Sequence, residues 1–223
     1  MEYKGVIFDL DGTLVNSLED IADSMNLVLQ SRNFSGHDLQ AYKYLVGNGI
    51  RKLVQEALPE AEREEGLINE CYNSMIEIYR NNCISKSTLY DGIPDLLDEL
   101  VSRGIKLAVL SNKADELTRK IASNLLSNWK FEVITGLSAE AYKKPNPLVA
   151  LQISGIFRIR PENIIYVGDT AIDMHTANNA GMYAVGVLWG FRTKEELTSN
   201  GAMCLLNHPL DLIQILNMVK ISN

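Results

Sequence analysis

Short apolar runs alternate with longer amphipathic segments along most of the chain. Runs that are apolar nearly throughout predict strands at residues 3–8, 105–110, 131–135, 163–167 and 183–188. Continuous apolar runs, unlike alternating ones, are typical of strands covered on both faces. Residues 91–103 carry apolar side chains at helical spacing, and 113–126 and 145–154 are further candidate helices. This alternation predicts an α/β fold built on a doubly wound parallel sheet.

Residues 16–87 interrupt the alternation. Their pattern predicts helices at 17–31, 39–46, 50–58 and 62–82, and it contains no convincing strand. The sequence Gly47-Asn48-Gly49 separates the second and third of these helices. An all-helical block placed directly after the first strand indicates an inserted helical cap domain. We therefore expect a core domain formed by residues 1–15 and 88–223, and a cap domain formed by residues 16–87.

Composition and charge restrict the class of partner. The chain has 223 residues, of which 46% are hydrophobic and 22% charged, values typical of a folded globular protein. The net charge of -7 argues against nucleic acid as a partner, because binding to phosphate backbones needs a cationic face. A small anionic ligand stays compatible with this charge, since one local positive pocket is enough to bind it.

Cysteine usage and hydropathy bear on the compartment. Cys71, Cys83 and Cys204 are odd in number and lack the spacing of a metal or redox motif, which favours free thiols in a reducing compartment. The first residues lack the apolar region of a signal peptide. No run approaches the ~18 apolar residues of a membrane span. These features predict a cytoplasmic protein with no membrane partner.

Two aspartates follow the first predicted strand, in the sequence Asp9-Leu10-Asp11-Gly12-Thr13. Side chains two positions apart in an extended chain point to the same side, so Asp9 and Asp11 are expected to face one spot. Two carboxylates about 4 Å apart repel by roughly 4 kcal/mol at an effective dielectric constant of 20. Such a pair needs a cation or a shared proton. The alternative is an ordinary turn with two solvated aspartates.

The fourth predicted strand ends in a similar way, at Gly168-Asp169, with Asp173 four residues further on. Asp173 shares a face with Asp169 if a helix has begun there. Simple capping of a helix N-terminus is the alternative. If the first and fourth strands are neighbours, three or four carboxylates gather at the carboxyl edge of the sheet, where doubly wound folds bind ligands. A few carboxylate ligands suit Mg²⁺, which keeps several waters.

Two other strand ends add a hydroxyl, an amide and an ammonium group. Ser111-Asn112 follows the second strand and Lys143-Lys144-Pro145 follows the third. Alone, such segments are more often a helix cap and a solvated lysine pair. Together with the aspartates they supply the groups needed for phosphoryl transfer by a carboxylate nucleophile assisted by Mg²⁺.

These motifs, taken in order, resemble those of the haloacid dehalogenase superfamily of phosphohydrolases. The matching segments are Asp9-Leu10-Asp11-Gly12-Thr13, Leu110-Ser111-Asn112, Lys144-Pro145-Asn146-Pro147, and Gly168-Asp169 with Asp173. The resemblance covers essentially the whole chain and implies a Rossmann-like catalytic core. The helical insertion is similar to the C1 cap of the phosphoglycolate phosphatase-like branch.

The resemblance implies a role for each matching residue. Asp9 is expected to be the nucleophile, Asp11 the general acid and base, and Lys144, in preference to Lys143, the lysine that offsets negative charge. The implied Mg²⁺ ligands are Asp9, the backbone carbonyl of Asp11, Asp169 and Asp173, the last binding through water or orienting Lys144. Phosphate contacts are expected from Thr13, Ser111, Asn112, Gly12 and the Leu10 N–H group. In the cap, the Gly49 loop is expected to meet the substrate, whereas Arg51 is either a substrate contact or an ion-paired surface arginine.

The resemblance also ranks the activities. A Mg²⁺-dependent phosphatase acting on a small phosphorylated metabolite comes first, with phosphoglycolate as the first substrate, and we expect a monomer or weak homodimer. An inorganic pyrophosphatase stays open as an alternative. A phosphomutase of the beta-phosphoglucomutase type is disfavoured, because Ile21 occupies the position of a histidine in those relatives. A dehalogenase is disfavoured because those relatives lack the second aspartate.

Overall fold

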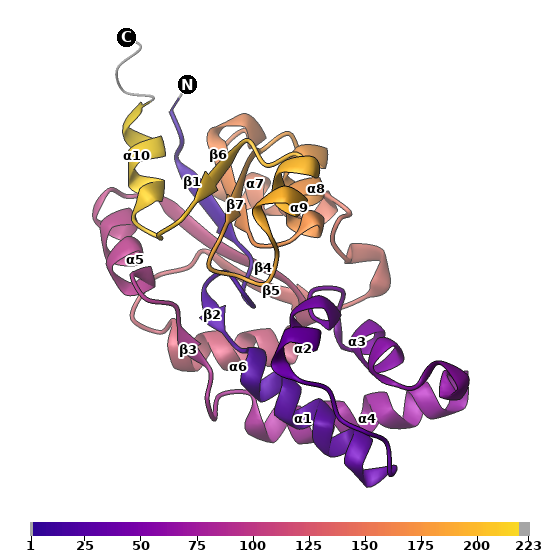
Figure 1. Ribbon diagram of the computed structural model, residues 1–223. Helices are drawn as coiled ribbons and strands as arrows, with labels where there is room; N and C mark the ends of the chain where they lie inside the picture. The colour runs from indigo at the N-terminus through magenta and orange to yellow at the C-terminus, as the bar shows by residue number, and fades with distance from the viewer. Residues whose placement is uncertain (1, 219–223) are drawn as a thin grey trace.

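The computed structural model describes residues 2–218 and has a parallel sheet at its centre (Figure 1). Its six strands lie in the order β5-β4-β1-β6-β7-β8, and all neighbouring pairs are parallel. In chain order the strands are β1 (Gly5–Phe8), β4 (Lys106–Ala114), β5 (Val133–Leu137), β6 (Ile164–Gly168), β7 (Tyr183–Val187) and β8 (Cys204–Leu206). The chain runs outward from β1 to β5, returns to β6, and runs outward to β8. This order places a topological switch point between β1 and β6.

Helices cover both faces of the sheet, as Figure 1 shows. The period of two along the strands decides which side chain meets which layer. Ile7 packs with α7 (Leu148–Phe157), α8 (Ala171–Asn179) and α9 (Lys194–Ser199) on one face. Val6 and Phe8 belong to the cluster on the other face, with α5 (Ile93–Ser102), α6 (Asp115–Leu125) and α10 (Asp211–Met218). Because both faces are covered, the strands are apolar almost throughout, and the predicted doubly wound α/β fold is confirmed.

The four α-helices between β2 and β3 form a separate group beside the sheet (Figure 1). They are α1 (Leu18–Ser31), α2 (Leu39–Leu45), α3 (Ile50–Ala57) and α4 (Glu65–Asn82), with a 3-10 turn at Glu60–Glu62. Helix α1 packs against α2 and α4, and α3 packs against α4. The chain enters this group through β2 (Val15–Asn16) and leaves it through β3 (Thr88–Leu89), which pair antiparallel. A prediction of no strand in residues 16–87 is therefore wrong at Asn16.

The strand at β4 is longer than its apolar run predicts. The run ends at Leu110, but β4 continues to Ala114, which pairs with Leu137 after a shift of register. The predicted helix start at residue 113 is therefore wrong, and α6 begins at Asp115. The edge strand β8 is short and only partly buried, and its pattern did not predict it. Two further 3-10 turns, Glu140–Tyr142 and Pro161–Asn163, precede α7 and β6.

Candidate active site

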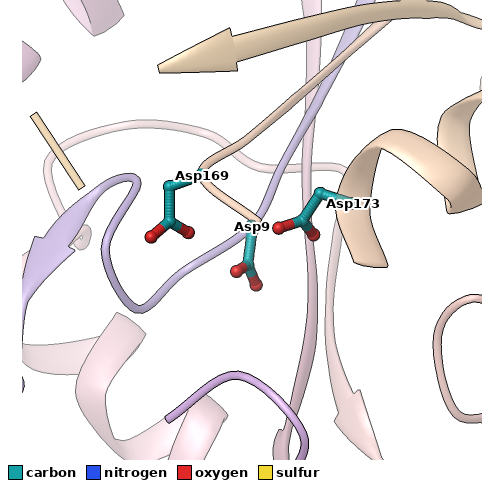
Figure 2. A group of neighbouring side chains, drawn as sticks. All are labelled: Asp9, Asp169 and Asp173. Carbon is teal, nitrogen blue, oxygen red and sulfur yellow. The ribbon is translucent and has the colours of Figure 1, made fainter. Parts of the chain in front are cut away.

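Three buried aspartates point into one space at the carboxyl edge of the sheet. Asp9 lies between Asp169 and Asp173 in Figure 2, and one carboxylate oxygen of each lies within 4.8 Å of the others. Asp169 and Asp173 are fully buried and Asp9 is 6% exposed. Because β1 and β6 are neighbours, with Phe8 opposite Val167, Asp9 and Asp169 leave the sheet side by side. The structure thus brings these three predicted residues together.

Lys144 lies among these carboxylates. Its Nζ is 2.8 Å from Asp9 Oδ1 and 2.7 Å from Asp173 Oδ1, and its side chain is 3% exposed. Burial alone would lower the pKa of Lys144, but the charges of Asp173 and Asp9 outweigh it and hold that pKa well above its usual value. Lys144 is therefore a fixed cation beside Asp9. Its neighbour Lys143 instead pairs with Glu140 and is more exposed.

Crowding of like charges changes the proton affinity of the aspartates. Burial and the charge of Asp173 raise the pKa of Asp9 to about 7, against the lowering effect of Lys144. Burial together with Asp173 and Asp9 raises the pKa of Asp169 well above its usual value. Asp9 Oδ1 lies at ion-pair distance from Lys144 yet accepts no hydrogen bond from the described residues. A bound cation would reduce the repulsion and give the Asp9 carboxylate a second positive partner besides Lys144.

Asp173 has a capping role as well as a place in the cluster. Thr170 is the N-cap residue of α8, and its backbone N–H and hydroxyl both donate to Asp173 Oδ2, the latter at 2.6 Å. Asp173 Oδ1 accepts from Lys144 at 2.7 Å and from the Tyr166 hydroxyl at 3.5 Å. Both of its oxygens therefore have protein partners. The Asp173 side chain therefore caps the N-terminus of α8 and also holds Lys144 in place.

The backbone at Gly12 approaches Asp169 too closely for any side chain. Gly12 has φ +82°, and a Cβ atom there would lie 2.3 Å from Asp169 Oδ2. The same oxygen accepts the Phe191 N–H at 2.8 Å, and Thr13 donates its hydroxyl to Asp169 Oδ1 at 3.4 Å. The loop after β1 thus positions Asp169, and Thr13 contacts that carboxylate in this structure.

Ser111 and Asn112 follow the apolar part of β4 and are buried. The Asn112 carboxamide accepts the Lys144 N–H at 2.8 Å and donates to the Lys144 carbonyl at 3.2 Å. It also donates to the Gly47 carbonyl at 3.3 Å, which ties the loop of the helical group to the sheet edge. Asn112 therefore positions the backbone of Lys144, while Ser111 lines a cavity between the sheet edge and the helical group.

Asp11 has a partner that the sequence did not predict. Its Oδ1 lies 2.6 Å from the Nζ of Lys113 and accepts the hydroxyl of Ser17. Lys113 is 5% exposed and also donates to the Tyr79 hydroxyl at 2.6 Å. Sequence reasoning assigned Lys113 to a helix start. Its position directly after Ser111-Asn112 was the only available signal, and a lysine at a helix start is ordinary.

A cavity of about 40 Å³ separates the sheet edge from the helical group. The core contributes Asp9, Asp11, Ser111, Asn112 and Lys113 to its wall. The helices contribute mainly apolar side chains together with the glycine loop and Tyr79, namely Ile21, Val46, Gly47, Gly49, Ile50, Leu53, Met75 and Tyr79. The site is thus open to a small molecule held between core and helices.

Two residues of the helical group were predicted to meet the substrate or to lie near it. Gly49 lines the cavity, whereas Arg51 does not. Gly49 caps α3 with φ +83°, and a Cβ there would lie 3.4 Å from the Asn112 carbonyl. Arg51 donates to Asn69 at 2.7 Å and pairs with Glu65, both on α4, and it borders an adjacent, more open hollow. Substrate binding by Arg51 stays a prediction, and the structure shows it ion-paired.

The donor set fits a hard divalent cation. Four buried aspartates (Asp9, Asp11, Asp169, Asp173) face two buried lysines (Lys113, Lys144), so the formal charge of this set is -2, and Asp169 has no lysine partner among the described residues. Oxygens around a six-coordinate Mg²⁺ lie about 3–4 Å apart, slightly closer than the spacing of up to 4.8 Å found here.

In residues 2–218, no helix is both long and apolar enough to cross a membrane.

The amino-acid sequence is similar to those of known hydrolases over most of its length. The family model for haloacid dehalogenase-like hydrolases matches residues 6–187. A phosphoglycolate phosphatase of Aquifex aeolicus is 32% identical over 216 residues, covering 95% of this chain and 96% of that protein. One from Chromobacterium violaceum is 31% identical and covers 96% of each. The similarity therefore spans the sheet, the helical group and the site.

Solved structures with a similar fold are also described as phosphoglycolate phosphatases. A crystal structure from Lactobacillus delbrueckii subsp. bulgaricus superimposes with a TM-score of 0.90 at 26% identity, covering 97% of this chain and 99% of that one. A predicted phosphoglycolate phosphatase from Haemophilus somnus superimposes with a TM-score of 0.88 at 28% identity, covering 96% and 98%. The overall fold is thus shared over nearly the whole of each chain.

Proposed function

Because this chain belongs to the haloacid dehalogenase-like hydrolase family and is an enzyme of the phosphoric monoester hydrolase class, we propose that it is a Mg²⁺-dependent phosphatase for phosphoglycolate or a close analogue. The observation that carries the proposal is the buried cluster of Asp9, Asp169 and Asp173 with Lys144 inside it. The names of the curated relatives support the choice of substrate. The small cavity above the cluster supports a small leaving group.

Asp9 is the nucleophile in this proposal. One of its carboxylate oxygens attacks phosphorus, the ester P–O bond breaks, and the phosphoryl group passes to Asp9 as an aspartyl phosphate. Lys144, held by Asp173, reduces the repulsion between this carboxylate and the phosphate. Ser111 and the N–H groups of Leu10 and Asn112 donate to phosphate oxygens, whereas the Gly12 N–H already donates to the Val15 carbonyl at 2.9 Å. Thr13, which contacts Asp169, completes the same wall.

Asp11 is the general acid and base. It gives a proton to the leaving alkoxide, then takes one from the water that attacks the aspartyl phosphate, which releases inorganic phosphate and free Asp9. Its carboxylate lies at the cavity wall, two residues after Asp9, and contacts Ser17 and Lys113. A contribution of about 10²–10⁴-fold to the rate is typical of such a group.

The metal site of the proposal uses Asp9, Asp169 and the backbone carbonyl of Asp11. Bound there, Mg²⁺ would polarise the phosphoryl group and offset negative charge. Asp173 already uses both oxygens for Lys144, Thr170 and Tyr166, which favours orientation of Lys144 or a contact through water. We also propose that residues 16–87 act as a cap domain over this site. A cytoplasmic location and a monomer or weak homodimer stay predictions, and the free thiols are compatible with the first.

Phosphate release from a panel of phosphoesters tests the proposal. The panel contains 2-phosphoglycolate, sugar phosphates, nucleotides and inorganic pyrophosphate, each with Mg²⁺ and with a chelator. We expect Mg²⁺-dependent turnover with 2-phosphoglycolate among the best substrates by kcat/KM. Asp9→Asn should reduce turnover by at least about 10⁴-fold, because the amide is a poor nucleophile for phosphorus.

Asp91→Asn is the matched control, since Asp91 is an exposed aspartate at a turn of the same core. It should keep wild-type turnover. Preference for pyrophosphate would replace the proposed substrate with a pyrophosphatase reaction. Absence of turnover on every member of the panel, from folded wild-type protein with Mg²⁺, would overturn the proposal.

A further inference from the structure

Lys113 is a second buried lysine at the cavity, and the mechanism above does not use it. It lies near the end of β4, and its side chain is 3% exposed. Its Nζ bonds Asp11 Oδ1 and the Tyr79 hydroxyl, each at 2.6 Å, and lies 4.7 Å from the centroid of the Tyr79 ring. Burial of an ammonium group is costly unless it has partners. Asp11 and Tyr79 supply these partners and hold the ammonium group at the cavity.

The ammonium group has an unused donor at the cavity. A lysine carries three N–H donors, and two acceptors bond Lys113 within residues 2–218, namely Asp11 and Tyr79. Lys113 also lines the cavity. It is the only lysine or arginine in that wall among the described residues. The free donor and the charge are thus available to a molecule that enters.

The position of Lys113 relative to Asp11 tells which part of a substrate it meets. In the proposed mechanism the phosphoryl group is transferred to Asp9, so the ester oxygen must lie within hydrogen-bond distance of Asp11, about 2.5–3 Å. Atoms beyond that oxygen continue into the cavity, toward Lys113. In a two-carbon hydroxy acid, the carboxylate lies only about 3 Å beyond the ester oxygen. A carboxylate at that place comes within reach of Lys113 while the oxygen stays beside Asp11.

We propose that Lys113 binds the carboxylate of the leaving group and selects phosphorylated two- or three-carbon hydroxy acids. The inference rests on the proposed phosphatase function and deepens it. The Tyr79 hydroxyl, on the opposite side of the cavity, holds the ammonium group in place. Apolar walls formed by Ile21, Leu53 and Met75 offer no partner to the hydroxyl groups of a sugar. The selected substrate is thus small, with one charged end.

A role for Lys113 limited to positioning Asp11 is the competing explanation. It predicts the same loss of rate for every phosphoester, because each leaving group needs Asp11. Carboxylate binding predicts a loss confined to acidic leaving groups. The two explanations separate when a substrate is compared with its uncharged isostere.

The experiment compares 2-phosphoglycolate with 2-phosphoglycolamide, in which an amide replaces the carboxylate. In the wild type with Mg²⁺, kcat/KM should be at least about tenfold higher for the acid. In Lys113→Met, kcat/KM for the acid should fall about 10–100-fold more than for the amide. Lys106→Met is the matched control, because Lys106 begins the same strand and donates to the Phe157 carbonyl, away from the cavity. Its ratio of acid to amide should equal that of the wild type.

Inhibition by free glycolate gives a second readout. Glycolate should inhibit the wild type competitively, and its inhibition constant should rise about tenfold or more in Lys113→Met, measured with the amide as substrate. Equal losses on both substrates, or an unchanged inhibition constant, would overturn carboxylate binding while leaving the phosphatase function intact. If the variant does not fold, the wild-type ratio decides, and equal rates on acid and amide overturn the inference. Failure of the phosphatase function itself shows separately, as absence of turnover on both.

Discussion

At the scale of single residues, the site is a balance between buried charges. Asp9, Asp169 and Asp173 repel one another in a space that excludes most water, and Lys144 offsets only part of that repulsion. The pKa of Asp9 rises to about 7 for this reason, with burial as the larger cause. Groups arranged in this way destabilise the protein unless a cation joins them. Function and metal-linked stability therefore depend on the same carboxylates.

Mg²⁺ is expected to stabilise the folded protein through this cluster. A ligand that binds only the folded state at 100 times its dissociation constant adds about 2.7 kcal/mol, which raises the melting temperature by about 5–10 °C in a chain of this length. Asp169→Asn should lose most of this shift, because its oxygen lies in the cluster. Asp91→Asn, at an exposed turn, should keep it. Thermal unfolding with and without Mg²⁺ measures the effect, and a full shift in Asp169→Asn would contradict it.

At the scale of elements, the junction between core and helical group depends on one buried carboxylate. Asp20 lies in the first turn of α1 and is 2% exposed. It accepts the N–H groups of Lys86 and Ser87 and the Ser87 hydroxyl, at distances of 2.6–3.0 Å. These bonds tie the start of α1 to the chain that leads into β3. The short β2–β3 pair alone, with two residues in each strand, provides little stability to that junction.

Asp20→Ala should therefore destabilise the protein strongly. Loss of a buried acceptor for two backbone N–H groups and one hydroxyl is expected to lower the free energy of unfolding by about 2–4 kcal/mol. Asp23→Ala is the control, since Asp23 lies one turn later on α1 but forms a more exposed ion pair with Lys86. It should leave the midpoint almost unchanged. Urea unfolding compares the two, and equal midpoints would show that the junction does not depend on Asp20.

At the scale of the whole molecule, a core arginine connects the two parts across the site. Arg192 follows β7, and its guanidinium donates to carbonyls at the end of α2, those of Lys43, Tyr44 and Val46. It also lies 5.4 Å from the centroid of the Tyr44 ring, and its side chain is 8% exposed. A cation at a helix C-terminus is favourable because it meets carbonyls that lack helical partners. The contact holds the Gly47–Gly49 loop against the sheet edge.

Loss of this contact should loosen the loop without unfolding the core. In Arg192→Met, amide hydrogen exchange at residues 43–49 should speed up about tenfold or more, while exchange in β1 and β6 stays at the wild-type rate. KM for the phosphoester should rise, because the loop lines the cavity. Lys194→Met, two residues further along and exposed, should change neither quantity. Unchanged exchange at residues 43–49 in Arg192→Met would contradict this role.

Features of the fold that depend on local sequence patterns were predicted more fully than features that depend on contacts between distant segments. Apolar runs predicted five of the six strands of the central sheet, because a strand covered on both faces must be apolar throughout. The edge strand β8 escaped because its exposed side lowers that signal. Membership of the haloacid dehalogenase-like family was predicted from ordered motifs and is confirmed. The roles of the site residues and the boundaries at 16–87 stay predictions.

The sequence by itself determined that Asp9, Asp169 and the segment of Lys144 follow predicted strands, and parallel strands end at one edge of a sheet. Their meeting there required β1 and β6 to be neighbours, which the sequence left as a condition. Tertiary structure alone decided the rest of the site. Lys113 meets Asp11 only because β4 continues beyond its apolar run, and it meets Tyr79 only because α4 packs over the sheet edge. Arg51 pairs with Glu65 because α3 packs against α4, a contact between segments that the local pattern does not show. Local patterns record burial and backbone preference, whereas contacts between distant segments depend on packing that no local pattern contains.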